Sequence, residues 1–178
     1  MLERKTNLAT LLKDPTLLVT KGFLAGNWVD GEKGATFDVC NPARGDTIAQ
    51  VSDLSRVQAS AAIAAAEGAQ KNWAAMKAKE RSIILRNWFN LMIENADDLA
   101  IILTAEQGKP LVEAKGEIVY GASFIEFFAE ETKRVYGETI PGHQPDKRIT
   151  VIKQPIGVAA SITPWNFPNA MITRKAGP

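Results

Sequence analysis

The sequence is poor in the residues that build covalent and metal-bound frameworks. Cys40 is the only cysteine and His143 the only histidine among 178 residues. One thiol excludes an internal disulfide. One histidine, lying in a turn-rich stretch, leaves a metal site or a serine–histidine triad without the second residue that each needs. We therefore expect no metal, and we expect Cys40 to be a small buried or half-buried thiol.

Long apolar runs and an excess of one charge are also missing. No stretch approaches the roughly 20 apolar residues of a membrane span, and charge appears too early, at Glu3 and Arg4, for a signal peptide. Lys and Arg total 21 against 20 Asp and Glu, a net charge of +1, which lacks the basic footprint of nucleic-acid binding. These absences predict a cytoplasmic protein that binds neither nucleic acid nor membrane.

The first of three zones ends near Ser52 and mixes a short helix with strand-like pieces. Leu8, Leu11 and Leu12 have helical spacing before Pro15, which predicts a short helix that stops there. The stretch 23–29 is typical of a strand pair.

The second zone, from Asp53 to Gly137, is predicted to be helical. Its first apolar stripe, stepping by four, comprises Val57, Ala61, Ala65, Ala69 and Trp73. A second comprises Leu85, Trp88, Phe89 and Met92, and a third Leu111, Ala114, Ile118, Ala122, Ile125 and Ala129. Asn95 is a candidate helix N-cap, and Pro110 is placed to open the third helix. We expect all four tryptophans to lie in the core or in a motif.

The third zone changes character. A turn-rich stretch at 141–146 leads to a predicted strand around Ile149–Ile152. The stretch 158–163 is apolar at nearly every position, which predicts a strand buried on both faces, as in a parallel sheet. A helix is predicted from Met171 to Ala176. Helices around a buried strand indicate the α/β class, and a sheet with one core strand is not a finished domain.

The stretch from Ile162 to Pro168 carries the most distinctive chemistry. Pro164 and Pro168 bracket Asn166 and fix the backbone around its amide, at the carboxyl end of the predicted strand. A rigid amide donor there suits the stabilisation of a developing oxyanion. From the residues alone, an alternative stays open, in which Asn166 makes an Asx turn and Trp165 belongs to the core.

Several motifs resemble one enzyme family. The heptapeptide 162–168 is similar to the signature of the aldehyde dehydrogenase superfamily, and 106–110 and 41–43 follow in the family's order. The stretches 170–178, 86–90 and 140–143 are similar to the succinate-semialdehyde branch. The resemblance runs from about Phe23 to Pro178.

This resemblance implies an α/β fold of which the chain is the N-terminal part. Residues 1–142 would be the helical part of the cofactor-binding domain, 143–157 an oligomerisation hairpin, and 158–178 the first core strand and helix start of the dinucleotide-binding sheet. The implied cofactor is NADP or NAD. The implied full-length protein is a homo-oligomer, a dimer or a tetramer.

The resemblance also implies a reaction in which a cysteine thiolate attacks an aldehyde, hydride passes to the nicotinamide, and a glutamate helps water to release the acid. Asn166 would then be the oxyanion donor, and Phe167 would line the aldehyde channel. Arg174 would bind a distal carboxylate, for which guanidinium is suited; a plain surface arginine is the alternative. The cofactor would be bordered by Ile162, Thr163, Pro164, Trp165 and Asn166.

The nucleophilic cysteine, the general-base glutamate and the ribose-binding lysine would lie beyond Pro178. Cys40 comes far upstream of the predicted site strand, so we do not expect it to be the nucleophile. The 178-residue chain alone is therefore predicted to be inactive. Two other readings are a non-catalytic interaction module that pairs with relatives through its hairpin, and a general binding domain with a coincidental motif.

An unpaired core strand and uncovered apolar helix faces predict that the 178-residue chain alone self-associates or is only partly folded. Light scattering should therefore give a mass above that of one chain. A monomer with a sharp, cooperative thermal transition would contradict this prediction.

Overall fold

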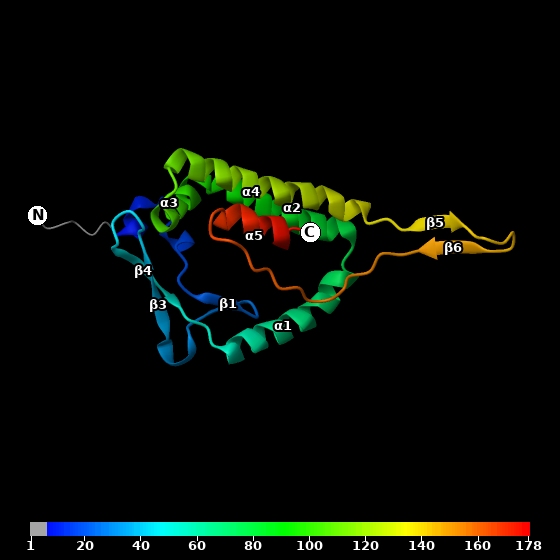
Figure 1. Ribbon diagram of the computed structural model, residues 1–178, viewed down its shortest axis with the longest axis horizontal. Helices are drawn as coiled ribbons and strands as arrows, with labels where there is room; N and C mark the ends of the chain where they lie inside the picture. Colours follow the sequence, from blue (N-terminus) through cyan, green and yellow to red (C-terminus); the bar gives the residue numbers. More distant parts are fainter. Residues whose placement is uncertain (1–6) are drawn as a thin grey trace, which may run out of the picture.

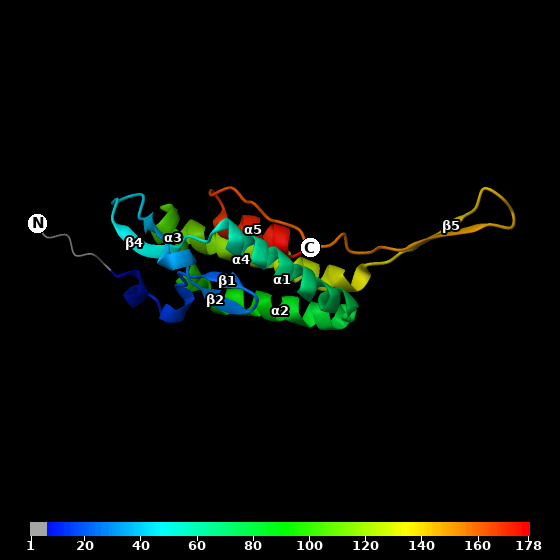
Figure 2. The ribbon, with the colours of Figure 1, turned by 90° about the horizontal axis from the view of Figure 1, so that it is seen from below.

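The computed structural model describes residues 7–178. Glu3 and Arg4, the early charges that argue against a signal peptide, lie outside the described part. The helices form a layered bundle, with small hairpins at one end of the molecule and a long hairpin projecting from the other (Figures 1 and 2). Three two-stranded sheets are present in the described part, and each is antiparallel.

The N-terminal region consists of short elements. The predicted short helix is the 3₁₀ turn η1 (Leu8–Leu11), followed by η2 (Pro15–Leu17). The predicted strand pair around 23–29 is confirmed as β1 (Gly22–Leu24) and β2 (Asn27–Val29). After η3 (Glu32–Gly34) comes a hairpin that the sequence did not reveal, β3 (Thr36–Cys40) with β4 (Thr47–Ser52).

Five α-helices follow in the order of the chain: α1 (Arg56–Ala75), α2 (Ala78–Glu94), α3 (Ala96–Gln107), α4 (Leu111–Glu131), extended by η4 (Thr132–Arg134), and α5 (Pro168–Ala176). Their ends have local causes. Ser55 and Gln58 form a capping box at the start of α1, and Gly108 ends α3 in the left-handed region, at φ 79°. Pro110 precedes α4, as predicted.

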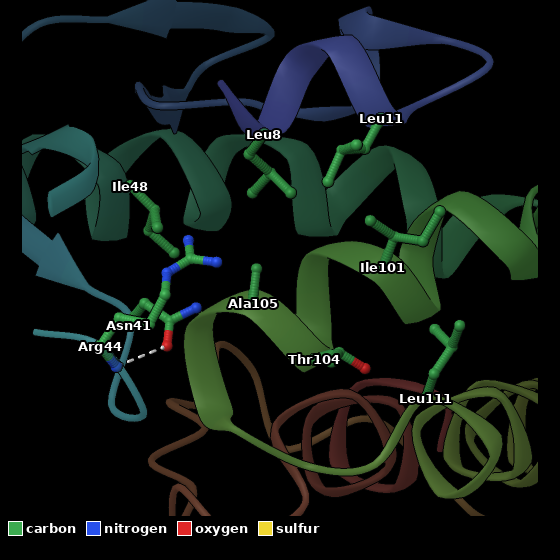
Figure 3. A pocket seen from close by; sticks show the side chains of 9 residues that line it. All are labelled: Leu8, Leu11, Asn41, Arg44, Ile48, Ile101, Thr104, Ala105 and Leu111. Atoms are coloured by element: carbon green, nitrogen blue, oxygen red, sulfur yellow. Dashed lines mark hydrogen bonds between the residues drawn. The ribbon is translucent and has the colours of Figure 1, made fainter. Parts of the chain in front are cut away.

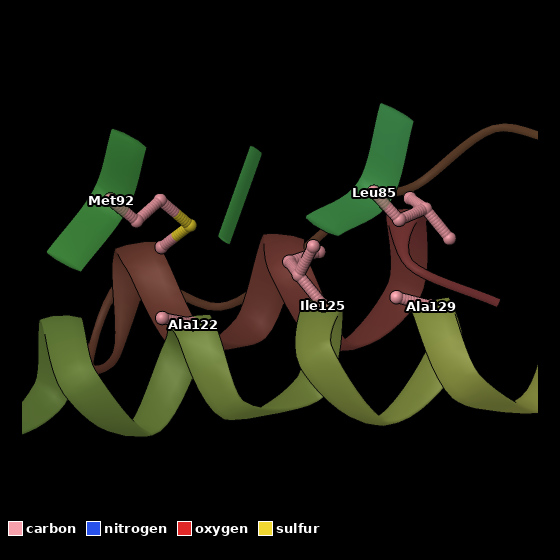
Figure 4. Close-up of a cluster of buried hydrophobic side chains, with 5 residues drawn as sticks. All are labelled: Leu85, Met92, Ala122, Ile125 and Ala129. Carbon is pink, nitrogen blue, oxygen red and sulfur yellow. The ribbon is translucent and has the colours of Figure 1, made fainter. Parts of the chain in front are cut away.

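Helix α4 is the centre of the core because it packs against α2, α3 and α5. Its predicted stripe is confirmed from Ala114 to Ala129, whereas Leu111 is exposed. One cluster on this stripe joins α2 to α4, and its members are Leu85, Met92, Ala122, Ile125 and Ala129 (Figure 4). A second cluster joins α3 to α4 through Ala96, Ala100, Leu103, Ala114 and Ile118.

The predicted buried strand at 158–163 is wrong. The stretch is extended but pairs with no strand of the described part, and Ile162 is 90% exposed. In Figure 1 it runs as a bare connection between β6 and α5. An apolar run expresses a tendency to be buried, but a strand also needs a neighbour to take up its backbone hydrogen bonds.

Burial differs from the expectations in three places. The apolar stripe at 57–73 forms the predicted helix, α1, but it is largely exposed, because α1 stands apart from the α2–α4 layer (Figure 1). The prediction of a buried or half-buried Cys40 is wrong, since this residue is exposed on β3. The expectation that the tryptophans lie in the core or in a motif holds only for the motifs: all four are partly exposed and belong to neither core cluster, but Trp88 and Trp165 lie within the stretches 86–90 and 162–168.

The candidate N-cap Asn95 precedes α3, but its side chain donates back to the Leu91 carbonyl instead of capping the helix.

The long hairpin consists of β5 (Glu138–Pro141) and β6 (Arg148–Val151), paired in antiparallel register. The sequence placed this arm at 143–157, so the pairing begins five residues earlier and ends before Ile152. All eight strand residues are exposed, because the arm projects away from the bundle (Figures 1 and 2).

Two neighbouring acids behave differently at the start of α3. Asp98 is buried and accepts the backbone N–H groups of Lys13 and Asp14, at 3.0 and 2.8 Å, which anchors the N-terminal segment. Asp97 stays half exposed, and hydrogen bonds from Lys115 and Lys13 lower the pKa of its carboxyl. Of these two consecutive acids, Asp97 therefore belongs to the surface and Asp98 to the interior.

Helix α5 lies directly against α4 because Gly121 has no side chain. A Cβ at Gly121 would overlap the side-chain oxygen of Asn169 and come within 3.1 Å of Thr173 Oγ1. Gly116, on the same helix, faces open space. The two glycines therefore separate the cost of crowding from the helix propensity of alanine.

We expect Gly121→Ala to destabilise the fold by about 1–3 kcal/mol, the usual cost of overpacking. Gly116→Ala, the matched control, should stabilise it by about 0.5–1 kcal/mol. Thermal unfolding of a full-length protein that contains these residues, followed by circular dichroism, measures both. An unchanged or raised midpoint for Gly121→Ala would show that α5 is not packed at this glycine.

Candidate functional site

The candidate site is the loop that leads into α5. Trp165 and Asn166 form a turn, and the helix begins at Pro168. Proline suits the first helical position because its fixed φ is close to the helical value and the N–H that it lacks would have no helical partner. Trp165 is 77% exposed, and Phe167 is partly exposed.

Lys109, in the connection between α3 and α4, holds the backbone of the loop. The Lys109 Nζ donates to the backbone carbonyl of Asn166 at 3.1 Å and lies 3.8 Å from the centre of the Phe167 ring. A cation over an aromatic face is attracted by the ring's negative face. A longer contact, 3.5 Å, runs from the Gln107 side-chain amide to the same carbonyl. One ammonium group therefore fixes two consecutive loop residues.

Glu117 of α4 completes this arrangement. Its Oε2 pairs with Lys109 Nζ, and its Oε1 accepts the backbone N–H groups of Asn169 and Ala170 at 2.9 and 3.3 Å. The Glu117 side chain is fully buried and that of Lys109 is 9% exposed. A carboxylate suits this place, since the first N–H groups of a helix lack internal partners and carry partial positive charge.

The side-chain amide of Asn166 is left open by these contacts. Its backbone carbonyl is engaged, but its side chain is exposed and makes no hydrogen bond to any residue between 7 and 178. The amide can therefore donate to an atom of a bound molecule.

Arg174 lies in the last turn of α5 and is exposed. Its Nη2 is 2.8 Å from the Met171 sulfur, and its guanidinium carbon lies 5.8 Å from the centre of the Phe124 ring of α4. It makes no ion pair with a carboxylate in the described part of the chain. The charge is thus available to an anion from outside.

The remaining predicted site residues lie on the exposed connection before the loop. Ile162 and Pro164 are exposed and Thr163 is half-buried. Residues 158–165 make no hydrogen bonds within residues 7–178, so their backbone groups are open to a ligand. The structure thus places Ile162–Phe167 in one exposed stretch and Arg174 in the last turn of α5, the helix that follows it.

An apolar hollow beside α3 lies elsewhere. A cavity of about 380 Å³ is lined by Leu8, Leu11, Asn41, Arg44, Ile48, Ile101, Thr104, Ala105 and Leu111. Figure 3 shows side chains from η1, the β3–β4 hairpin and α3 converging on it. Neither residues 162–168 nor Arg174 line it, so it is separate from the candidate site.

Two further kinds of feature are absent from residues 7–178. Histidine, cysteine, aspartate and glutamate nowhere gather in a group of three or more that could hold a metal ion. None of the described helices combines the length and apolarity that a membrane crossing requires.

Sequence reasoning missed Lys109 and Glu117 as parts of the site. Lys109 entered only as a member of the stretch 106–110, and Glu117 was not singled out. One signal was available, because Glu117 lies directly beside Ile118 on the apolar stripe, where a buried acid requires partners.

Comparison with known proteins gives a consistent result. Residues 28–178 match the aldehyde dehydrogenase family. Over 167 residues, 94% of this chain, it is 62% identical to a glutarate-semialdehyde dehydrogenase of Pseudomonas putida and 61% identical to the succinate-semialdehyde dehydrogenase [NADP(+)] GabD of Escherichia coli, covering 35% of each. A succinate-semialdehyde dehydrogenase structure from Burkholderia pseudomallei superposes with a TM-score of 0.91 at 55% identity, over 93% of this chain and 34% of that one. The chain thus spans about a third of the length of these relatives.

Proposed function

Because this chain belongs to the aldehyde dehydrogenase family and has the N-terminal part of its fold, we propose that it supplies part of an active site that oxidises an aldehyde with a distal carboxylate. Succinate semialdehyde is the proposed substrate, and succinate is the product. The observation that carries the proposal is the side-chain amide of Asn166. It is exposed and makes no hydrogen bond within the described residues, whereas the backbone carbonyl of the same residue is held by Lys109.

Asn166 has one chemical task in this proposal. When a thiolate adds to an aldehyde, the carbonyl oxygen gains negative charge, and a fixed N–H donor stabilises that charge without having to reorganise. The Asn166 side chain can act as that donor because its carbonyl is held by Lys109 and its amide is left free. Phe167, under the Lys109 ammonium, would form a wall of the aldehyde channel.

Arg174 would bind the distal carboxylate. Side chains on a helix lean toward its N-terminus, so Arg174 leans toward the Asn166 end of α5, and its contact with Met171, one turn earlier, agrees with this direction. Arg174 lies six positions after Pro168, a rise along the helix of roughly 9 Å, and its long side chain reaches back over part of that distance. The names of both relatives above contain aldehydes that carry a carboxylate at the other end.

NADP or NAD would supply the hydride acceptor. The extended stretch Ile162–Trp165 fits a dinucleotide in one respect, because its exposed backbone groups are free of internal partners. Ile162, Thr163, Pro164, Trp165 and Asn166 would border the ribose and nicotinamide. The name of the Escherichia coli relative includes NADP, but we propose no preference between the two cofactors. The cytoplasm stays a prediction from the sequence.

The test is a hybrid enzyme in which this chain is joined to the part of the Escherichia coli relative that it does not cover. We expect the hybrid to form NADPH from succinate semialdehyde. The 178-residue chain alone should form none, because its single cysteine lies on β3, outside the loop. A hybrid that is folded but without turnover would contradict the proposed function, and turnover by the chain alone would contradict its inactivity.

A second candidate function, a pairing module, is favoured by the projecting β5–β6 arm. Ile140, Ile149 and Val151 are partly exposed on it, and an exposed strand edge is a template for another chain. The same arm would make the full-length protein a homo-oligomer, a dimer or a tetramer. Mixed oligomers of the inactive chain with the Escherichia coli relative would favour the module.

Asn166→Ala in the hybrid should lower kcat by about 10²–10³, the usual cost of losing one oxyanion donor. Asn169→Ala, in the first turn of α5, is the control for a general disturbance. Steady-state kinetics with succinate semialdehyde measure both. Unchanged turnover in the Asn166 variant would remove this residue from the mechanism.

Arg174→Ala should raise KM for succinate semialdehyde. The loss of binding free energy should be on the order of 2–5 kcal/mol if the charge pair is desolvated. An uncharged aldehyde of similar length should be hardly affected, because it makes no pair with the guanidinium. Lys175→Ala, the neighbouring cation, is the matched control. Equal losses on the two aldehydes would mean that Arg174 has a structural role.

A further inference from the structure

Lys109 and Glu117 grip the candidate loop from both of its ends. The ammonium of Lys109 binds the Asn166 carbonyl and covers the Phe167 ring. The carboxylate of Glu117 binds the N–H groups of Asn169 and Ala170. The ion pair between Lys109 and Glu117 connects these two sets of contacts, so residues 166–170 are attached to α4 as one unit.

Stability alone does not explain such a pair. Removing two charges from water is costly, and replacing a buried ion pair by apolar residues of similar volume is often neutral or stabilising. Lys115 and Asp97 form a pair of the same chemical type on the surface, where both side chains are about half exposed. The buried pair differs in that each partner also binds the loop.

We infer that Lys109 and Glu117 are positioning residues, which fix the direction of the Asn166 amide through the Asn166 carbonyl and the first turn of α5. The inference rests on the proposed function of Asn166. Holding the carbonyl fixes the peptide plane after Asn166, and holding Asn169 and Ala170 fixes where the helix starts. Between these two anchors, the backbone of Asn166 is restrained, which limits where its side-chain amide can reach.

The effect on catalysis should follow from that geometry. A donor that is displaced by about 1 Å contributes much less to the transition state, and such a misplacement can cost about 10²-fold. Substrate binding depends on Arg174, at the other end of α5, so it should change little. We therefore expect kcat to fall while KM stays nearly constant.

The variant has to remove the contact with Asn166 without leaving an unpaired charge in the core. Lys109→Met alone would leave Glu117 charged, buried and unpaired, which is strongly destabilising. The combination of Lys109→Met with Glu117→Gln removes both charges, and the glutamine carbonyl can still accept the N–H groups of Asn169 and Ala170. The Lys109 hydrogen bond to the Asn166 carbonyl is lost and only the long contact from Gln107 remains, whereas the cap of α5 is kept.

The combined variant is compared in the hybrid enzyme with Asn166 present and with Asn166→Ala, as a double-mutant cycle. With Asn166 present, we expect kcat for succinate semialdehyde to fall by about 10–100-fold and KM to stay within about twofold. In the Asn166→Ala background we expect kcat to fall by less than about twofold, because there is no amide left to misplace. Lys115→Met, which removes the surface pair, should leave kcat unchanged.

Three results would overturn the inference. An unchanged kcat in the combined variant would show that the pair does not position the amide. An equal loss in both backgrounds would show a general structural role, and a loss confined to KM would place the pair in substrate binding. Without turnover in the unmodified hybrid, the proposed function itself fails and the inference with it, which is a separate and recognisable outcome.

Discussion

The buried pair between Lys109 and Glu117 is the constraint on which the candidate site depends. It connects the centre of the core to the loop, because α4 carries both the apolar stripe and the Glu117 carboxylate. Packing of α2 and α3 against α4 therefore fixes the position of a charge, and that charge fixes the start of α5. The core and the site are thus parts of one arrangement.

Helix α5 transmits this constraint to the second end of the site. Gly121 lets α5 lie close to α4, and Glu117 holds its first turn, so the helix has little freedom to slide or tilt. The amide at one end and the guanidinium at the other are then kept at a fixed separation. A substrate with an aldehyde and a carboxylate at opposite ends matches two polar groups arranged in this way.

The sequence predicted those parts of the fold in which a local pattern decides the outcome. The stripe of α4 repeats every three to four residues, which is sufficient to specify a buried helix face. The strand at 158–163 was predicted wrongly because an apolar run cannot show whether a partner strand lies beside it. The spacing of the stripe at 57–73 predicted the helix α1 correctly. It could not show whether a neighbouring element covers that face of the helix, and the face is largely exposed.

The site was predictable in part. The residues alone suggested Asn166 as a donor but left an Asx turn open, and they left Arg174 as a surface arginine. The family resemblance favoured the two site roles, which stay predictions. Glu117 was missed because an acid on a helix is usually solvated. It is buried here because Lys109 and the N–H groups of Asn169 and Ala170, 52 and 53 positions further on, meet it in space. Single-sequence patterns do not contain such long-range meetings.

The most direct measurement is a crystal structure of the hybrid enzyme with succinate semialdehyde trapped on its nucleophile. The predicted result is an Asn166 side-chain nitrogen about 3 Å from the substrate-derived oxygen, with Lys109 on the Asn166 carbonyl and Arg174 on the distal carboxylate. An Asn166 amide turned away from that oxygen, while Lys109 and Glu117 remain paired, would contradict the proposed role of the loop.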